Sequence, residues 1–418
     1  MHGRAGRTGL IAFDRKAPGL TGIAVRGFLL SLITFGIYRF WYITELRRFF
    51  WSRTLIDGSP AEYTGRGKEL FLGFLVALAI LIPLYIAIFV ASISVPALAP
   101  FAGALSFPIL FVLGQFALYR GRRYRASRTF WRGIRLGQDG SGIAYALMAA
   151  GWWLLTLLTF GLAFPFMRAS LERYRIDHTL VGSSRMSSTA TGRSILGPWL
   201  LFYSVALLPV ILSLAVAFAG LGFAIPEDLL VERGSRTILN PAYDSVTKTA
   251  IGFSVVGALG FGTVAGVLLI PFYRARETKA FMNAASLGPA RLASTLRAGQ
   301  FYWPYLVYFL SLIGFVLLIL VIAVLLGGGL HLAGSQSGMH IAIALGTIVL
   351  YLGGALLVAV LHVRLIQARL WEAVATTTVI DDADGLDAVL ASSRAQASGL
   401  NEGMADALDL GGAIEIGL

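Results

Sequence analysis

Apolar stretches alternate with polar, often basic, segments along most of this chain of 418 residues. Eight such stretches lie at about residues 27–43, 70–94, 101–119, 143–167, 198–225, 249–273, 302–326 and 341–363. About 20 apolar residues are enough for a helix to cross the hydrocarbon core of a bilayer. The pattern therefore predicts an all-α integral membrane protein.

Arginine and lysine are distributed unevenly among the polar segments. They are concentrated in the segments 45–69, 120–141, 168–196 and 274–300, whereas the turn at 95–99 and the loop at 327–339 contain none. Basic residues accumulate in the cytoplasmic loops of membrane proteins. If all eight stretches crossed the bilayer, two adjacent basic segments, 120–141 and 168–196, would lie on opposite sides.

This conflict disappears if the stretch 143–167 enters and leaves the membrane by the same face. Its 25 residues are too few for two full crossings but suffice for a re-entrant pair of half-helices. We expect the same of 27–43, with both tips facing the bundle interior, because lipid does not tolerate exposed broken backbone. The prediction is six transmembrane helices, two re-entrant segments and both termini in the cytoplasm. Eight full transmembrane helices are the alternative.

An internal repeat supports the equivalence of the two short stretches. Thr34-Phe35-Gly36 recurs as Thr159-Phe160-Gly161, at an offset of 125 residues. We divide the membrane domain, residues 1–375, into two copies and a last helix pair, at about 27–141, 150–300 and 302–363. The remaining residues, 376–418, carry eight acidic side chains and one basic one. They are expected to form an acidic cytoplasmic tail that is partly disordered.

The basic segments share a further form, in which an aromatic helix end passes into a β-prone piece with a glycine turn. Short cytoplasmic hairpins are expected at Asp57-Gly58, Asp139-Gly140, Gly182, Gly288 and Gly385. Because an isolated two-stranded hairpin is only marginally stable, these hairpins are candidates for pairing with one another.

The first of these repeats also carries a family resemblance. The runs LITFGIYRFW, RRFFWSRTLIDG and EYTGRGKEL resemble the YjgN-like family of bacterial inner-membrane proteins, whose domain has no assigned function. The resemblance is dense over residues 27–75 and extends through the repeats to about residue 375. It implies a multi-pass protein of the inner membrane, and it supplies no reaction, ligand or catalytic residue.

Composition excludes several classes of function. The chain is 57% apolar and 13% charged, whereas soluble domains are about 45–50% apolar and about 25% charged. It has no cysteine, so disulfides, thiolate catalysis and cysteine-ligated metals are excluded. The net charge of +12 could suggest nucleic acid. Because the arginines adjoin apolar stretches, we instead expect contact with anionic lipid head groups and no nucleic acid.

No catalytic or metal-binding pattern is visible. The five histidines form no paired ligand motif, and no Ser/His/Asp order appears. Thr64-Gly65-Arg66-Gly67-Lys68 lacks the spacing of a phosphate loop and suits a turn that anchors the next helix. We therefore expect no cofactor, no metal site and no enzymatic activity.

Two groups of residues are candidates for binding. The first group surrounds the re-entrant tips, where half-helix ends could bind an ion or small anion, and comprises Thr34, Gly36, Arg39, Glu45, Thr159 and Gly161. Helix packing at the glycines and a local ion pair are the structural alternatives. The second group is an arginine collar at the inner mouth of the bundle, and comprises Arg47, Arg48, Arg122, Arg123, Arg125, Arg173, Arg175, Arg274 and Arg276. The alternative is that each arginine contacts lipid separately and sets orientation.

Two functions remain open from the sequence. In the first, the protein binds or passes a small solute or lipid at the re-entrant segments. In the second, it is an envelope scaffold or assembly factor that acts through its cytoplasmic hairpins and tail. Anionic membrane lipids are the expected partners in either case, and no protein partner or oligomeric state can be derived.

Overall fold

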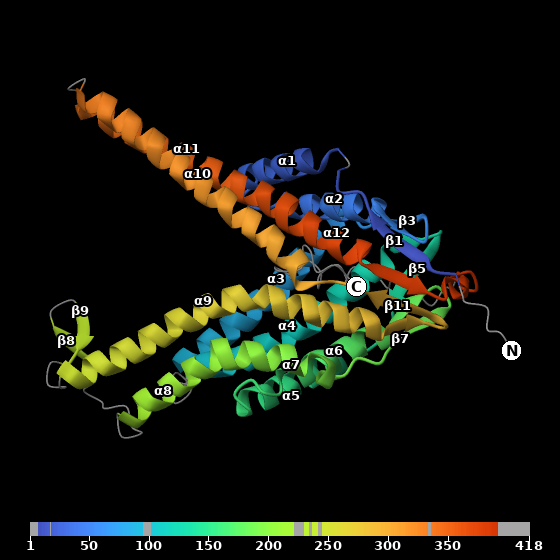
Figure 1. Ribbon diagram of the computed structural model, residues 1–418. Helices are drawn as coiled ribbons and strands as arrows, with labels where there is room; N and C mark the ends of the chain where they lie inside the picture. The colour runs from blue at the N-terminus through green and yellow to red at the C-terminus, as the bar shows by residue number, and fades with distance from the viewer. Residues whose placement is uncertain are drawn as a thin grey trace.

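A closed β-barrel forms one end of the molecule, and long helices extend from it (Figure 1). The computed structural model describes residues 7–16, 18–94, 102–220, 230–233, 236–240, 245–332 and 336–391. The helices are α1 Leu20–Ile33, α2 Arg39–Ser52, α3 Gly67–Ser94, α4 Ala102–Ser127, α5 Gly142–Leu158, α6 Phe164–Asp177, α7 Gly192–Phe202, α8 Leu208–Gly220, α9 Ser245–Ala284, α10 Ala298–Leu332, α11 Gln336–Leu361 and α12 Ala368–Thr376. Single π-helical turns, η2 Tyr203–Leu207 and η3 His362–Gln367, join α7 to α8 and α11 to α12.

Ten antiparallel strands make the barrel, in the order β1-β12-β11-β10-β7-β6-β5-β4-β3-β2. Their bounds are β1 Gly9–Phe13, β2 Thr54–Ile56, β3 Ser59–Tyr63, β4 Thr129–Trp131, β5 Ile134–Gln138, β6 Thr179–Val181, β7 Ser184–Ser188, β10 Ala285–Leu287, β11 Ala290–Ser294 and β12 Thr378–Asp381. A separate two-stranded ribbon, β8 Leu230–Arg233 with β9 Arg236–Leu239, lies between α8 and α9. Closure removes the free edges that would make short strands marginal.

Tight turns join four of the strand pairs. The expected turns form at Asp57-Gly58, Gly182 and Gly288, where positive φ angles suit glycine. The turn expected at Asp139-Gly140 is instead at Arg132-Gly133, because β4 ends at Trp131, four residues beyond the end of α4. Gly140 precedes α5, packed so closely that a Cβ there would collide with the Tyr119 hydroxyl.

The fifth pair has no hairpin at Gly385. That glycine belongs to a 3₁₀ turn, η4 Ala383–Leu386, which follows β12. The partner of β12 is β1 from the N-terminal region, with Leu10 opposite Val379. β1 also pairs with β2, so it closes the barrel. A strand from the opposite end of the chain therefore replaces the missing half of the hairpin.

The prediction of an all-α chain with six transmembrane helices is wrong. The barrel makes this an α+β molecule. Among the described residues, five helices are long and apolar enough to cross a membrane. They are Gly67–Ser94, Gly192–Val216, Val255–Ala284, Ala298–Ile322 and Leu350–Thr376.

The alternative of eight full crossings is also wrong. The first and fourth apolar stretches form helical hairpins, α1–α2 and α5–α6, that leave the barrel and return to it. The helix α1 has 14 residues, so it is about 21 Å long at 1.5 Å per residue. That is shorter than the roughly 30 Å of a hydrocarbon core. The strands of all four basic segments meet in one barrel, which strict alternation of sides would not allow.

Element boundaries coincide at the offset of 125 residues. The helices α2 and α6, the strands β2 and β6, and the strands β3 and β7 all begin and end at positions 125 residues apart. The tips agree as well, since Phe35 and Phe160 both have φ of 50°, and Gly36 and Gly161 have φ of 87° and 97°. The two Thr-Phe-Gly motifs therefore form the same turn.

The prediction that both tips face the bundle interior is wrong. Phe35 is 97% exposed and Phe160 is 69% exposed. The turn pairs much of the broken backbone locally, and at the second tip Trp199 Nε1 also donates to Gly161 O at 3.0 Å. The Thr34 hydroxyl donates to Leu30 O and accepts from the Tyr38 N–H, and Thr159 makes the same pair of bonds with Leu155 and Ala163.

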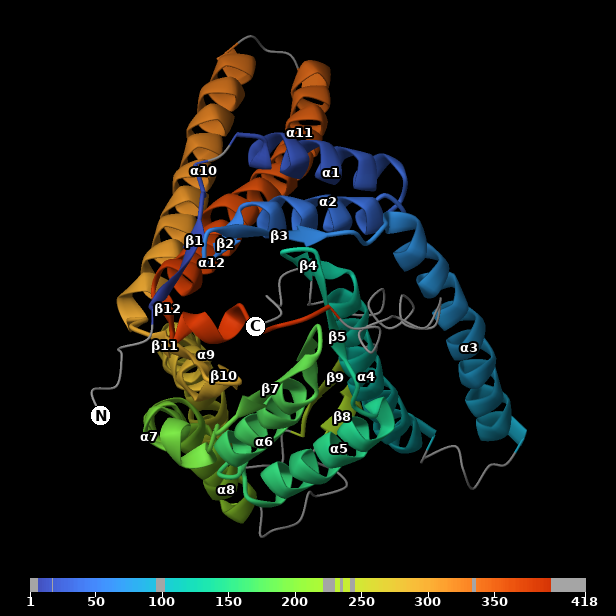
Figure 2. The same ribbon diagram turned by 90° about the vertical axis from the view of Figure 1, so that its right-hand side faces the viewer.

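Part of the predicted acidic tail belongs to the barrel. Strand β12 is in the sheet, and the segment after it crosses the end of the barrel where the tight turns lie, as the red chain in Figure 2 shows. Leu386 and Val389 of this segment pack on Trp131 and Val181 inside the barrel. The rest of the predicted tail, residues 392–418, lies outside the described residues.

Candidate ligand site at the barrel mouth

A cavity of about 500 Å³ occupies the barrel interior and continues between the bases of the helices. Inward-facing side chains from nine strands line its barrel portion, as expected from the alternation of faces along a strand. They are mainly Ile11, Ile56, Trp131, Leu136, Val181, Met186, Leu287, Leu292 and Ile380. This part of the cavity is apolar, and Leu386 of η4 lies at its closed end.

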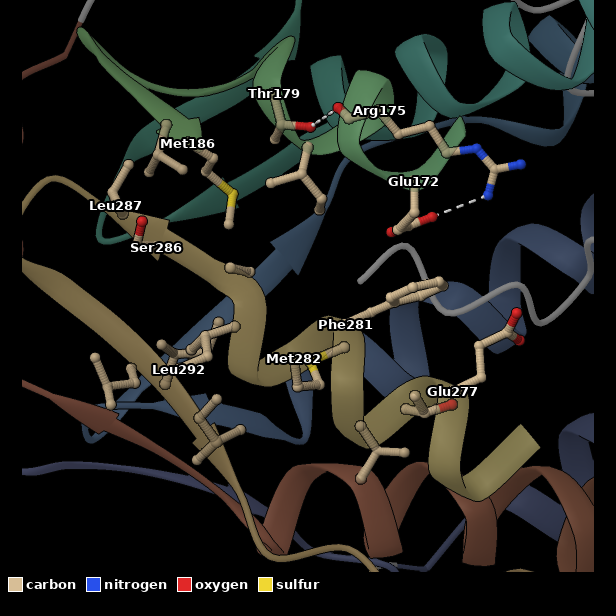
Figure 3. Close-up of a pocket in the computed structure, with 18 of the residues that line it drawn as sticks. Glu172, Arg175, Thr179, Met186, Glu277, Phe281, Met282, Ser286, Leu287 and Leu292 are labelled. Carbon is tan, nitrogen blue, oxygen red and sulfur yellow. Dashed lines mark hydrogen bonds and ion pairs between the residues drawn. The ribbon is translucent and has the colours of Figure 1, made fainter. Parts of the chain in front are cut away.

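The helix-side portion of the cavity is charged. We call the following six residues the rim: Arg122 from α4, Arg168, Glu172 and Arg175 from α6, and Arg274 and Glu277 from α9. Their spacing of three, four or seven residues places the α6 members on one helical face and the α9 members on another. Figure 3 shows the two faces opposite each other across the opening. With four arginines and two glutamates, the rim has an excess of positive charge.

Glu277 is the most buried member of the rim, with a side chain 3% exposed. It accepts hydrogen bonds from Arg168 Nε at 2.6 Å, from Arg274 Nη1 at 3.3 Å and from the Tyr273 hydroxyl at 3.2 Å. A buried carboxylate is costly unless it is paired and hydrogen-bonded. Here, one carboxylate on α9 holds an arginine from α6 and another from its own helix.

Arg175 is fixed from two sides. Its Nη1 donates to Glu172 at 3.2 Å, and its Nη2 and Nε donate to the Tyr145 hydroxyl at 2.6 Å and 3.0 Å. Its guanidinium group lies 5.5 Å from the centre of the Tyr145 ring. Tyr145 itself is completely buried, packed against Tyr119 and Met167. The arginine is therefore positioned before any ligand arrives.

The structure brings together only part of the predicted collar. Arg122, Arg175 and Arg274 reach the cavity. The exposed Arg173 and Arg276 are directed elsewhere, and so is Arg123. Arg47 is buried and donates to the Tyr63 hydroxyl, Arg48 donates to Gly65 O, and Arg125 is buried in the base of α4. Consecutive arginines on a helix point to different sides, so they cannot all reach one mouth.

Sequence reasoning missed Arg168, Glu172 and Glu277. A helical-face analysis would have found them, because Arg168 lies two turns before Arg175, and Glu277 lies three residues after Arg274. Their opposite charges at helical spacing resemble ordinary surface pairs. Only the packing of α6 against the α9 side of the barrel distinguishes these three residues from such surface pairs.

The candidates around the helical tips do not line this cavity. Thr34 and Thr159 bond within their own turns, and Gly36 and Gly161 supply the positive φ angles of those turns. Glu45 pairs with Arg26 at 2.6 Å and accepts from the Tyr38 hydroxyl at 3.1 Å. Arg39 begins α2. These contacts match the structural alternative of a local ion pair and turn-forming residues.

The described ranges contain no cluster of three or more His, Cys, Asp or Glu side chains suited to a metal ion. Residues 9–407 match the family model described as "Bacterial protein of unknown function (DUF898)". The chain belongs to this family.

A curated relative agrees with that membership. The protein named "Inner membrane protein YjgN", from Salmonella typhimurium, is 27% identical over 149 residues. The alignment covers 35% of this chain and only 34% of the length of that relative. The resemblance to the YjgN-like family is thereby confirmed. No solved structure matches the chain.

Proposed function

We propose that the protein is a non-enzymatic component of the bacterial inner membrane that binds a small anionic amphiphile in the barrel-mouth cavity. The observation that carries the proposal is the division of this cavity, with an apolar barrel interior on one side and the arginine-rich rim on the other. Such a ligand would place its apolar chain in the barrel and its anionic group at the rim.

The size and lining of the cavity favour this class of ligand. Sites for small molecules are typically about 300–1,000 Å³, mostly apolar, with a few placed polar groups, and this cavity has about 500 Å³. Arginine binds carboxylate and phosphate groups through two parallel hydrogen bonds. Both rim glutamates are engaged with arginines, which favours a role in positioning the cations rather than in chemistry.

The inner-membrane location rests on the name of the relative and on the five long apolar helices. We propose that the barrel and the described chain ends lie on the cytoplasmic side, because the basic segments adjoin the barrel. In this arrangement α1–α2 and α5–α6 are re-entrant segments. The coincident element boundaries also favour an internal duplication.

The test is binding by matched arginine variants. Purified protein in detergent would be titrated with a radiolabelled long-chain fatty acid and with a radiolabelled lysophosphatidylglycerol. Arg274→Gln is expected to weaken binding by about tenfold, the value of one charge-assisted hydrogen bond of about 1.5 kcal/mol. Arg276→Gln, on the same helix but outside the cavity, is the control and should bind normally.

Equal affinities of the two variants would contradict a site at the rim. If neither amphiphile binds the unaltered protein, while a neutral analogue with the same chain does, the proposed anionic class is wrong. Comparing the two ligands also distinguishes a carboxylate from a phosphate as the anionic group.

A further inference from the structure

The two helical hairpins end in apolar tips whose largest side chains are mostly exposed. In the first hairpin, Ile33 is 70% exposed and Phe35 is 97% exposed. In the second, Leu157, Leu158 and Phe160 are 73%, 68% and 69% exposed. The sequence has no charged residue from position 27 to 38 or from 140 to 167. Contiguous exposed apolar surface of this kind marks an interaction site.

The backbone of both tips is fitted to an apolar environment. The Phe35 N–H donates to Leu32 O and the Gly36 N–H to Ser31 O, and the second tip repeats these bonds with Leu157 and Thr156 as acceptors. Together with the threonine hydroxyl bonds, they leave few polar groups unpaired where the helix is broken. Unpaired backbone groups in hydrocarbon cost several kcal/mol each. The first tip pairs its backbone groups without a protein neighbour at the glycine, since nothing lies within 4 Å of a Cβ at Gly36.

Each hairpin packs beside a helix that is long and apolar enough to cross a membrane. The helix α1 packs beside α11, which belongs to the candidate membrane span Leu350–Thr376, and α6 packs beside α7, which belongs to the candidate span Gly192–Val216. All of them extend from the same side of the barrel (Figure 1). A hairpin arm about 21 Å long, rooted at the barrel, ends beside the spanning helices before the far side of a roughly 30 Å core.

We propose that α1–α2 and α5–α6 are inserted in the membrane leaflet next to the barrel, and that their tips contact lipid acyl chains. Phe35 and Phe160 are the deepest side chains of this contact. The inference specifies the partner of the re-entrant segments put forward above, and it does not depend on a ligand in the cavity. Because α6 also carries Arg168 and Arg175, the second hairpin links the leaflet to the rim.

Fluorescence quenching in membranes tests this partner directly. The chain has no cysteine, so Phe35→Cys and Phe160→Cys can each be labelled with an environment-sensitive fluorophore. The proteins would be reconstituted in vesicles of phosphatidylethanolamine and phosphatidylglycerol. We expect blue-shifted emission, strong quenching by lipids brominated on their acyl chains, and little quenching by iodide in the water. Glu62→Cys, an exposed position on the barrel strand β3, should show the opposite pattern.

Quenching of the Phe35 label by iodide would overturn the proposal, because it would place the tip in water. Protection from both quenchers would also overturn it, because a second protein copy would then cover the tip. Ile33→Cys and Leu158→Cys provide equivalent exposed positions in helices if a tip variant fails to fold. The readout is independent of ligand binding, so its failure is distinguishable from failure of the cavity proposal.

Discussion

The side chain of Asp57 joins three parts of the chain at the turn end of the barrel. It is 7% exposed and accepts from Arg7 Nη1 at 2.7 Å, Arg7 Nη2 at 2.9 Å and Arg132 Nη2 at 2.7 Å. The same two arginines bind Asp387. The hydrogen bond from Arg7, assisted by the charges of both arginines, lowers the pKa of Asp57 below its ordinary value, although burial acts against this.

This lowered pKa makes the stability of the barrel sensitive to acid. Ionised Asp57 stabilises the fold at pH values above the pKa of an unfolded aspartate, and the contribution is lost as pH falls through the lower folded pKa. Asp57→Asn is expected to lose roughly 1.5–3 kcal/mol at neutral pH and to show less destabilisation on acidification. Thermal unfolding in detergent, followed from neutral to acidic pH, measures both effects.

Asp381→Asn is the control, since Asp381 is exposed on β12 and should unfold like the unaltered protein. A parallel acid response in Asp57→Asn and the unaltered protein would contradict the assignment to Asp57.

At the scale of elements, the chain after β12 acts as a strap across the end of the barrel. Asp382 has φ of 59°, which turns the chain into η4 and directs residues 383–391 over the barrel. The Ser183 N–H donates to Leu390 O at 2.8 Å. Leu386 lies against the cavity at this end. The strap therefore closes the barrel opposite the rim.

Gly182 is the position most sensitive to this closure. A Cβ at Gly182 would collide with the Leu390 carbonyl, whereas a Cβ at Gly288 meets nothing within 4 Å, although both glycines have φ near 60°. Each alanine substitution should cost about 1–2 kcal/mol from the left-handed conformation. Only Gly182→Ala should also displace the strap and accelerate labelling of a Leu386→Cys thiol by a water-soluble maleimide. Equal labelling rates in the two backgrounds would show that the strap is not held there.

At the scale of the whole molecule, the barrel depends on strands from the two ends of the sequence. β1 lies between β12 and β2, and the eight barrel strands other than β1 and β12 come from four local hairpins. Aromatic packing reinforces this closure, since Phe13 stacks on Phe50 at 5.7 Å and also contacts Trp371. The first and last described strands therefore lie side by side.

Engineered disulfides can verify this closure and its register. Leu10 lies opposite Val379, and Leu10 is 64% exposed. Opposed positions in an antiparallel pair have Cα atoms about 4.5–5.5 Å apart, within the range of a disulfide. Leu10→Cys with Val379→Cys should therefore form an intramolecular disulfide under mild oxidation and migrate faster on a non-reducing gel.

Leu10→Cys with Ile380→Cys is the matched control, because Ile380 is 4% exposed and belongs to the opposite, inward face. If the control pair cross-links as well as the designed pair, the register differs from the one described. Stabilisation of the designed variant by about 2–4 kcal/mol is expected from a cross-link that closes so long a loop.

The sequence by itself determined the membrane character, the family, three of the five expected strand turns and the equivalence of the two Thr-Phe-Gly motifs. These properties depend on composition, on apolar length and on residues close together in the chain, such as Asp57 and Gly58.

The tertiary structure decided what the local pieces build together. The pairing of β1 with β12 joins segments about 370 residues apart, which no local pattern records. The same holds for the rim, because Glu277 and Arg168 meet only when α6 and α9 converge on one barrel. Exposure of the tips was also decided there, since the threonine hydroxyls pair backbone groups of the turns while the Phe35 and Phe160 side chains stay exposed.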